Sequence, residues 1–308
     1  MPVLKVSDVK KNYDGREVLH GIDLSVDKKE VYGLLGPNGA GKSTLLNIVV
    51  NLITEYTGSV ELFGKKINHS SLFDIGFVPQ DLAIYEDLSA YQNVNFFGSL
   101  YKLKGKPLDE KCEAALKMVG LWDQRKRKPS AFSGGMKRRL NIACSIVHNP
   151  ELIILDEPTV GIDPQSRNYI LESIKVLNES GATIIYTSHY MEEVEAICHK
   201  VAIMDDGNIV ENGLISEIKE KYQKNNCYEC ILESGTQAKS IFPKKLISNI
   251  STEDNKIVIT FNKDFVLIED VVALARNKKA LISIGKYRPN LEDIFLDITG
   301  KALRDGDN

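Results

Sequence analysis

A glycine-rich segment from Gly36 to Thr44 constrains the fold of this chain more than any other part of its sequence. It reads Gly-Pro-Asn-Gly-Ala-Gly-Lys-Ser-Thr and fits the pattern G-x-x-x-x-G-K-[ST] in full. The apolar run Val31–Leu35 before it predicts a buried strand, and the apolar run 45–50 after it predicts a helix. Glycines let backbone N–H groups turn toward an anion, and a helix N-terminus adds positive charge. The segment is therefore predicted to bind the phosphates of a nucleoside triphosphate.

The side chains of this segment suit two further tasks. Lys42 is placed to reach the β- and γ-phosphates, and the Ser43 hydroxyl is placed to ligate Mg²⁺, with Thr44 as a second hydroxyl. The other predicted phosphate contacts are Gly36, Asn38, Gly39, Ala40 and Gly41.

Length and charge narrow the possible classes of protein. The chain has 308 residues, enough for one large domain and a small second one. Its net charge of −3 gives no overall attraction to nucleic acid. No stretch approaches the roughly 18–20 apolar residues that cross a bilayer, and the N-terminus lacks the apolar region of a signal peptide. We expect an intracellular protein whose membrane role, if it has one, needs a partner.

The hydrophobic pattern predicts an α/β fold for most of the chain. Residues 3–35 are rich in strand patterns, and residues 86–128 are mostly helical, with breaks near Gly105 and Pro107. The runs 152–155 and 182–187 are continuously apolar, as in the strands of a parallel sheet. A helix over 164–179, starting at Pro164, is predicted between them.

The pattern changes near a polar stretch at 223–226, which predicts a linker. We therefore expect a large domain over residues 1–224 and a small α+β domain over residues 225–308. The small domain is predicted to hold strands at 227–233, 256–261 and 280–286 and helices at 266–277 and 290–298. Cys227 and Cys230 form a C-x-x-C pair there, but no second pair or nearby His completes a zinc set, so free thiols are expected.

A carboxylate pair, Asp156 and Glu157, follows the predicted strand 152–155. Ligands in open α/β sheets bind at the carboxyl ends of the strands, so this pair belongs beside the phosphate loop. Asp156 is expected to hold Mg²⁺ through water, and Glu157 to polarise an attacking water as general base.

Further motifs follow in a fixed order along residues 1 to about 220. Phe132-Ser133-Gly134-Gly135-Met136 opens a predicted helix, Gln80 follows Gly76-Phe-Val-Pro, and His189 follows the strand 183–188. Tyr13 precedes the phosphate loop, and Gly161-Ile-Asp163-Pro follows the carboxylate pair. Together these motifs resemble the nucleotide-binding subunit of an ABC transporter. The resemblance implies a P-loop NTPase core with a β-rich N-terminal subdomain and a helical insert, with ATP and Mg²⁺ as ligands.

The resemblance also implies a role for each motif. Ser133, Gly134 and Gly135 would contact the ATP held by the other subunit, although Met136 stands where the family signature has Gln. Gln80 would contact Mg²⁺ and the attacking water and lead into a helical insert, about residues 81–130, that binds the membrane partner. His189 would contact the γ-phosphate and support Glu157. Two smaller contacts are implied: Tyr13 would stack on adenine, and Asp163 would cross the dimer interface.

The family geometry implies two subunits facing head to tail around two ATP molecules. A homodimer is the simplest interpretation because both catalytic halves are intact in this chain, while a degenerate heterodimeric partner stays open. The subunit would act at the cytoplasmic face of the cell membrane, held there by a separate permease. The tail 288–299 and the segment 132–139 resemble ATPases paired with exporters of drugs, antibiotics, lipids or polysaccharides.

Two other functions remain as alternatives. An importer ATPase would share the same motifs. A soluble ABC-type ATPase acting on DNA or ribosomes is disfavoured, since the chain has one cassette, no heptad run and no basic excess.

Overall fold

The computed structural model describes residues 2–232, 246–253, 256–262 and 281–300, with the isolated positions 269 and 272. The chain divides into two compact units. One comprises Met1–Ile215 with Phe295–Asn308, and the other comprises Ser216–Ile294. The division falls at Ile215, somewhat before the boundary expected at residue 224.

The first part of the larger unit is an antiparallel sheet with the strand order β2-β1-β4-β5. Alternate residues of the two long strands are buried, because only one face of this sheet packs on the core. The strands are β1 (Pro2–Tyr13), β2 (Arg16–Asp27), β4 (Thr57–Leu62) and β5 (Lys65–Lys66).

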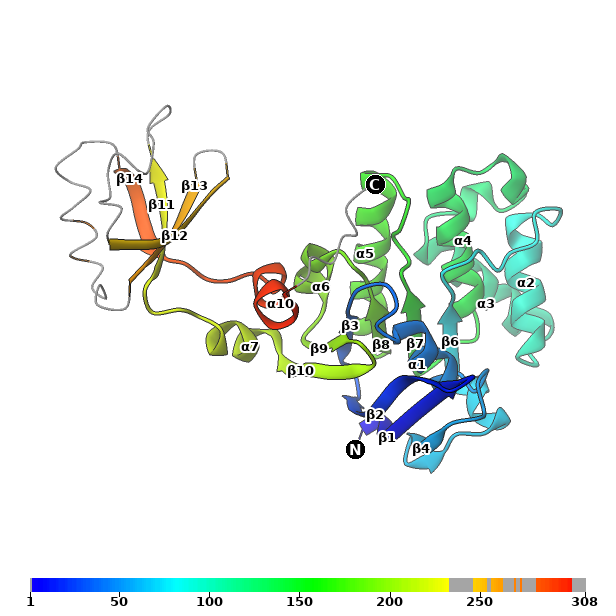
Figure 1. Cartoon of the computed structure of the whole chain (residues 1–308). Helices are drawn as coiled ribbons and strands as arrows, with labels where there is room; N and C mark the ends of the chain where they lie inside the picture. The colour runs from blue at the N-terminus through cyan, green and yellow to red at the C-terminus, as the bar shows by residue number, and fades with distance from the viewer. Residues whose placement is uncertain are drawn as a thin grey trace. The chain divides into compact units, whose positions relative to one another are not determined.

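A six-stranded sheet with the order β10-β9-β3-β8-β7-β6 forms the centre of the same unit (Figure 1). Every residue of β3, β7 and β8 is buried, as expected for parallel strands with continuously apolar sequences. The predicted α/β fold is confirmed by this sheet. Its strands are β3 (Val31–Leu35), β6 (Ile75–Val78), β7 (Leu152–Asp156), β8 (Thr183–Thr187), β9 (Lys200–Asp205) and β10 (Asn208–Leu214).

Four neighbouring strands of this sheet, β3, β8, β7 and β6, run in the same direction. Their carboxyl ends therefore meet at one edge, although the strands are far apart in the sequence. The phosphate loop follows β3, the carboxylate pair ends β7, Gln80 follows β6 and His189 follows β8. Strand order alone thus places the main predicted motifs at one edge of the sheet.

Helices of the larger unit connect these strands. Residues 81–130, predicted as a helical insert, contain α2 (Ala90–Leu100) and α3 (Gly105–Met118), with short 3-10 helices at Trp122–Gln124 and Pro129–Ala131. Helices α2, α3 and α4 lie together beside β6 (Figure 1). The remaining helices are α1 (Lys42–Val49), the 3-10 helix His69–Asp74, α4 (Gly134–Ile146), α5 (Pro164–Glu179) and α6 (Met191–Ile197).

The smaller unit is built on an antiparallel sheet with the order β12-β13-β11-β14. Cys227 and Cys230 lie buried on β11 and form no disulfide. The strand β12 was not predicted from the sequence. Of the helix predicted over 266–277, only the isolated positions 269 and 272 are among the described residues, and both are helical. Its strands are β11 (Cys227–Leu232), β12 (Ile247–Glu253), β13 (Lys256–Phe261) and β14 (Leu281–Lys286). The helices α7 (Ile215–Lys221) and α10 (Leu291–Thr299) cross the division of the chain, since Ile215 and Phe295–Thr299 belong to the larger unit.

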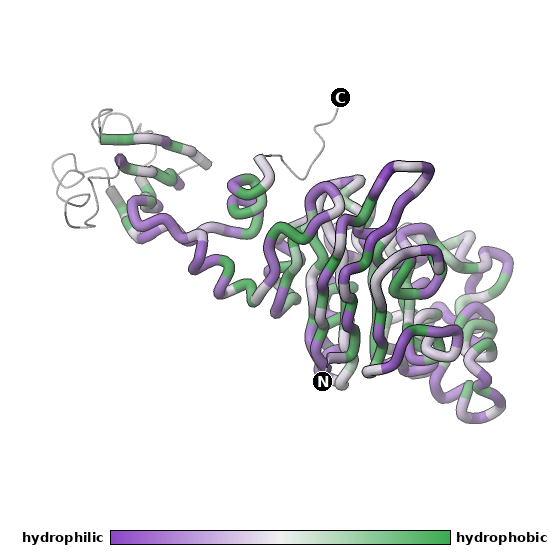
Figure 2. The backbone as a smooth tube through the Cα atoms, turned by 60° about the horizontal axis from the view of Figure 1, so that its bottom comes forward, coloured by the Kyte–Doolittle hydropathy of each residue, from purple (hydrophilic) through white to green (hydrophobic). Residues whose placement is uncertain are grey.

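Hydropathy along the backbone follows this arrangement. Hydrophobic segments are distributed through the larger unit (Figure 2), and the central strands β3, β7 and β8 are buried at every residue. Within the described ranges, none of the helices has the length and apolar content to span a membrane.

His148 joins three elements of the larger unit. It follows α4, and its Nε2 lies 3.1 Å from the carbonyl oxygen of Ile75, the first residue of β6. Its ring stacks on Tyr101 at the end of α2, with 3.5 Å between ring centroids. Burial lowers the pKa of His148 to about 4, the Ile75 hydrogen bond acts in the opposite direction, and nearby Lys111 lowers it further.

The pKa of His148 predicts a pH-dependent contribution to stability. An unfolded histidine titrates near pH 6.5, above the folded value, so this contribution is present above about pH 6.5 and lost as the pH falls toward about 4. His148→Gln retains an N–H donor for Ile75 but does not titrate. We expect the difference in unfolding free energy between wild type and this variant, from urea denaturation, to shrink between about pH 7 and pH 5. A difference that stays constant over this range would contradict the assignment.

Candidate active site

The phosphate loop leaves β3 at Leu35 and enters α1 at Lys42, and its backbone requires glycine. Gly36, Gly39 and Gly41 have φ angles of 157°, 82° and 99°. A Cβ on Gly36 would lie 2.4 Å from the carbonyl oxygen of Met204. Met204 is part of β9, so this oxygen cannot move without disturbing the strand. The sequence folds into a loop here because only glycine fits these angles and this close approach.

Lys42 is buried at the start of α1 and points back over the loop. Its Nζ donates to the carbonyl oxygens of Gly36 at 2.7 Å and Pro37 at 3.1 Å. Burial lowers the pKa of Lys42, while Glu157 and Asp156 act in the opposite direction. The side chain is therefore held over the loop by neutral acceptors, in a position where it can bind a phosphate oxygen.

The two predicted carboxylates end β7 and are linked to β8 through Thr187. The Thr187 hydroxyl donates to Asp156 Oδ1 at 2.7 Å and accepts the N–H of Glu157 at 2.8 Å. Both carboxylates are buried, with 5% and 7% exposure. Glu157 has a φ of 47°, a left-handed conformation that a residue other than glycine adopts at a cost.

Three predicted residues converge on the Glu157 carboxylate. Gln80 Nε2 donates to Oε2 at 3.3 Å, and His189 Nδ1 lies 3.6 Å from the same oxygen. Lys42 Nζ lies 3.9 Å from Oε1. The ends of four parallel strands thus supply one cluster of an amide, an imidazole, an ammonium and a carboxylate.

A pocket of about 190 Å³ lies against this cluster. The phosphate loop forms most of its wall, so the phosphates of a bound nucleotide would lie here. Val18 of β2 lines it and was not predicted, because its position depends on how the two sheets pack. The other lining residues are Asn38, Gly39, Gly41, Lys42, Ser43, Thr44, Gln80 and Glu157.

The residues of the Ser-Gly-Gly motif lie elsewhere, at the N-terminus of α4. Ser133 caps this helix, with its Oγ accepting the N–H of Met136 at 3.2 Å. Ser133 and Gly134 are exposed, and neither lines the pocket. A Cβ on Gly135 would lie 2.1 Å from Ser166 Oγ, so glycine is needed where α4 packs against the start of α5.

Asp163 and Tyr13 also lie outside the pocket lining. The Asp163 carboxylate accepts the N–H of Ser166 at 2.9 Å and so caps α5, and this hydrogen bond is the main cause of its lowered pKa. Tyr13 is 44% exposed at the end of β1, with Lys11 Nζ 4.7 Å from its ring centroid. The structure therefore gives Asp163 a local capping role that the sequence analysis missed.

Arg138 is a second residue whose role was missed. From α4 it donates to the carbonyl oxygens of Pro79 at 2.9 Å and Gln80 at 2.6 Å. The sequence placed it only within a basic helix, because nothing local to Arg138 indicates which loop it would reach. It ties the helix that begins at Ser133 to the loop that carries Gln80.

The residues present fit a magnesium nucleotide. Ser43 is exposed at the phosphate loop and Asp156 supplies a carboxylate, and hydroxyl and carboxylate oxygens are the ligands that Mg²⁺ prefers. Among the residues that the structure describes, no group of three or more His, Cys, Asp or Glu could hold a metal on its own.

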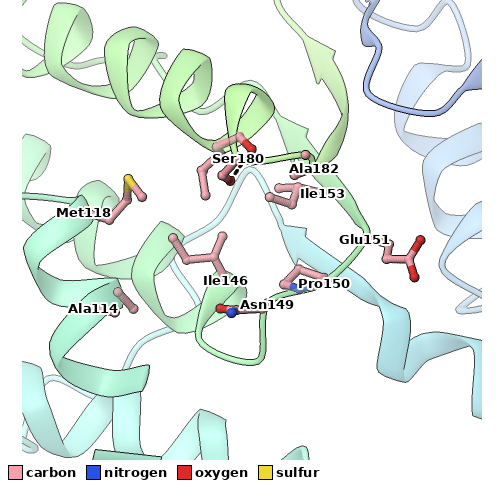
Figure 3. A pocket seen from close by; sticks show the side chains of 12 residues that line it. Ala114, Met118, Ile146, Asn149, Pro150, Glu151, Ile153, Ser180 and Ala182 are labelled. Atoms are coloured by element: carbon pink, nitrogen blue, oxygen red, sulfur yellow. Dashed lines mark hydrogen bonds between the residues drawn. The ribbon is translucent and has the colours of Figure 1, made fainter. Parts of the chain in front are cut away.

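A larger hollow, of about 440 Å³, lies at the amino ends of β7 and β8 rather than at their carboxyl ends (Figure 3). Met118 and Ala114 of α3 face Ile153 across it, and Ile146, Pro150 and Ser180 complete much of the wall. None of the predicted site residues lines it.

Comparisons with known proteins agree with this geometry. Residues 19–160 match the family model described as ABC transporter. The chain is 37% identical to the linearmycin resistance ATP-binding protein LnrL of Bacillus subtilis, over 98% of this chain and 100% of that protein. It is 32% identical to the Nod factor export ATP-binding protein I of Cupriavidus pinatubonensis, over 98% of this chain and 92% of that protein.

Solved structures show the same fold. The chain shares 31% identity and a TM-score of 0.66 with cbiO1 from Clostridium perfringens, part of an ABC transporter complex, over 71% of this chain and 91% of that one. It shares 27% identity and a TM-score of 0.62 with an ATP-binding cassette in a dimeric post-hydrolysis state bound to ADP and Pi, over 68% of this chain and 98% of that one.

The fold and the site thus define a nucleotide-hydrolysing P-loop protein. More particularly, the chain belongs to the ABC transporter family, as an ATP-binding subunit that hydrolyses ATP in transport and works with a membrane permease. The predicted family, activity and ligands, ATP and Mg²⁺, are confirmed.

The Thr187 hydroxyl offers a test of how the carboxylate pair is held. Thr187→Val keeps the shape of the side chain but leaves the buried N–H of Glu157 without its acceptor. We expect the unfolding free energy, from urea denaturation, to fall by about 1–3 kcal/mol. Thr187→Ser retains the hydroxyl and should lose less. Equal urea midpoints for the two variants would show that the hydroxyl does not hold this turn.

Proposed function

We propose that two copies of this chain clasp two ATP molecules head to tail and drive an export permease from the cytoplasmic face of the membrane. The observation that carries this proposal is the convergence of Lys42, Gln80 and His189 on the buried carboxylate of Glu157.

Each residue of this cluster has a distinct part in hydrolysis. Glu157 accepts a proton from the attacking water, and its left-handed backbone aims the carboxylate at the phosphate pocket. Gln80 and His189 orient that carboxylate. With ATP bound, Lys42 would hold the γ-phosphate and His189 would contact it. Mg²⁺, when bound by Ser43 and through water by Asp156, supplies positive charge to the phosphates.

The position of the Ser-Gly-Gly motif supports the dimer. Ser133 and Gly134 are exposed at the N-terminus of α4 and do not line the phosphate pocket of their own chain. A helix N-terminus binds anions, so a second copy turned head to tail would close each pocket with its own Ser133, Gly134 and Gly135. Tyr13, exposed at the end of β1, is then free to stack on adenine.

Export is favoured over the alternatives by the relatives. The two relatives described above are named for antibiotic resistance and for Nod factor export. The basic residues of α4 also argue against a nucleic-acid surface, because Arg138 and Arg139 both donate to backbone carbonyls within the chain. A permease encoded and purified with a solute-binding protein would instead indicate import.

An aromatic surface on the helical insert suits the permease. Tyr85 and Phe96 are exposed and meet edge to face at 5.1 Å, and Leu100 lies one turn further along α2 and is 56% exposed. The buried side chain of Asn93 fixes the loop by accepting the N–H of Tyr85 at 2.7 Å and donating to its carbonyl oxygen at 2.9 Å. Exposed aromatic and aliphatic side chains at this place support the proposal that the insert binds the permease.

The catalytic part of the proposal is tested with two variants. Glu157→Gln should retain ATP binding, lose at least about 100-fold in turnover and accumulate as a dimer with ATP and Mg²⁺ in analytical ultracentrifugation. Ser133→Arg should also bind ATP, because its fault lies on the surface offered to the other copy, but it should stay monomeric and inactive. Wild-type protein that remains monomeric with saturating ATP while hydrolysing at full rate would refute the head-to-tail dimer.

The docking surface is tested by membrane fractionation of cells that also express the permease. Phe96→Ser with Leu100→Ser removes exposed apolar area and should release most of the protein from membranes. Leu52→Ser with Val176→Ser is the matched control, since both are exposed apolar residues outside the insert. Equal membrane association of the two double variants would place the permease contact elsewhere.

A further inference from the structure

A buried carboxylate, Glu193 of α6, lies behind the active site, and none of the chemistry above uses it. It is 3% exposed. Its Oε2 accepts three hydroxyl hydrogen bonds, from Tyr186 at 2.7 Å, Thr159 at 2.8 Å and Ser188 at 2.9 Å. Three hydroxyl groups from two separate segments therefore point at one oxygen.

The other carboxylate oxygen of Glu193 faces a cation. Arg167 Nε, from the second turn of α5, lies 3.2 Å from Oε1. Burial and the nearby Glu193 raise the pKa of Tyr186 well above its ordinary value, so its hydroxyl stays a donor to Glu193. A buried ion pair adds little to stability, because the cost of desolvating the two charges offsets much of their attraction. We therefore ask whether Glu193 has a role besides stabilising the fold.

The partners of Glu193 are neighbours of the active-site residues. Thr159 follows Glu157 by two positions, and Ser188 directly precedes His189. Arg167 lies one helical turn beyond Asp163, whose carbonyl oxygen accepts its backbone N–H at 2.9 Å. Glu193 thus connects the segment after the general base, the segment before the histidine and the start of α5.

A second set of contacts reaches the His189 ring. The Ser188 hydroxyl that donates to Glu193 also accepts the N–H of Tyr190 at 2.9 Å. The Tyr190 ring lies 4.3 Å from the ring of His189, and the Arg167 guanidinium lies 4.6 Å from the Tyr190 centroid. Both sequence neighbours of His189 are therefore connected to Glu193. Ser188 is bonded to it directly, and Tyr190 is connected through Arg167.

We propose that Glu193 is a positioning residue for ATP hydrolysis, which fixes the His189 imidazole against the Glu157 carboxylate. This inference rests on the roles given to His189 and Glu157 in the proposed function. His189 Nδ1 and Glu157 Oε2 lie 3.6 Å apart, and Glu193 bonds Ser188 and Thr159, which flank these two residues in the sequence. A residue with only a structural role would change stability without a specific effect on kcat.

The first test compares two serines of similar burial. Ser188→Ala removes a hydroxyl bound to Glu193, whereas Ser173→Ala removes a hydroxyl of α5 that donates to the Tyr169 carbonyl oxygen at 2.8 Å, away from the site. Ser188→Ala and Glu193→Gln should each lower kcat about 10-fold with KM for ATP changed by less than about 2-fold. Ser173→Ala should keep the wild-type kcat. Equal kcat for the two serine variants overturns the proposal.

The second test asks whether Glu193 acts through His189. Steady-state ATPase rates are measured for Glu193→Gln, His189→Ala and the double variant, each normalised to the nucleotide-binding fraction so that misfolded protein does not count. If Glu193 positions His189, the double variant should be no slower than His189→Ala alone. Losses that multiply would show independent effects and overturn the proposal.

The same measurements separate this inference from the function on which it rests. If His189→Ala hydrolyses ATP at the wild-type rate, His189 has no part in the proposed mechanism. The positioning role of Glu193 is then refuted as well. Impaired hydrolysis by His189→Ala, with wild-type kcat for Glu193→Gln and Ser188→Ala, would overturn the positioning role alone.

Discussion

The parallel pairing of β3, β8, β7 and β6 is the constraint on which the rest of the larger unit depends. Parallel strands need long connections, and those connections supply the helices on either side of the sheet. Because all four strands end at one edge, the loops that follow them share a small volume. Strand order therefore brings the phosphate loop, the carboxylate pair, Gln80 and His189 to the same edge of the sheet.

The charges at the carboxyl ends of these strands explain why the site can bind a phosphate together with a cation. Asp156, Glu157 and Lys42 are all buried, with two negative charges against one positive charge. The Thr187 hydroxyl and the Gln80 amide satisfy carboxylate oxygens, and loop carbonyls satisfy Lys42. A magnesium triphosphate brings both a cation for the carboxylates and an anion for Lys42 and the loop N–H groups, so binding improves both halves of the site.

The helix capped by Ser133, α4, contacts both the proposed dimer surface and the loop that carries Gln80. Its exposed N-terminus can accept an anion from outside the chain, while Arg138 in its second turn holds the backbone of Pro79 and Gln80. Gln80 in turn bonds Glu157 and leads into the helical insert. A shift of α4 would therefore reach both Glu157 and the surface proposed for the permease.

The sequence by itself determined the local features. The glycine positions of the phosphate loop, the apolar strands β3, β7 and β8, and the start of α5 at Pro164 all follow from backbone angles, periodicity and capping within a few residues. The order of the motifs also indicated that Glu157, Gln80 and His189 act together, through resemblance to a family rather than through geometry.

Tertiary structure decided the contacts between distant residues. Gln80 and Glu157 are 77 positions apart, and Arg138 and Pro79 are 59 apart, so no local pattern could pair them. The positions of Val18 and Glu193 likewise depend on which strands are neighbours and on how helices pack across them. Hydrogen bonds and rotamers act over a few ångströms, and only the folded order of the strands brings such residues within that range.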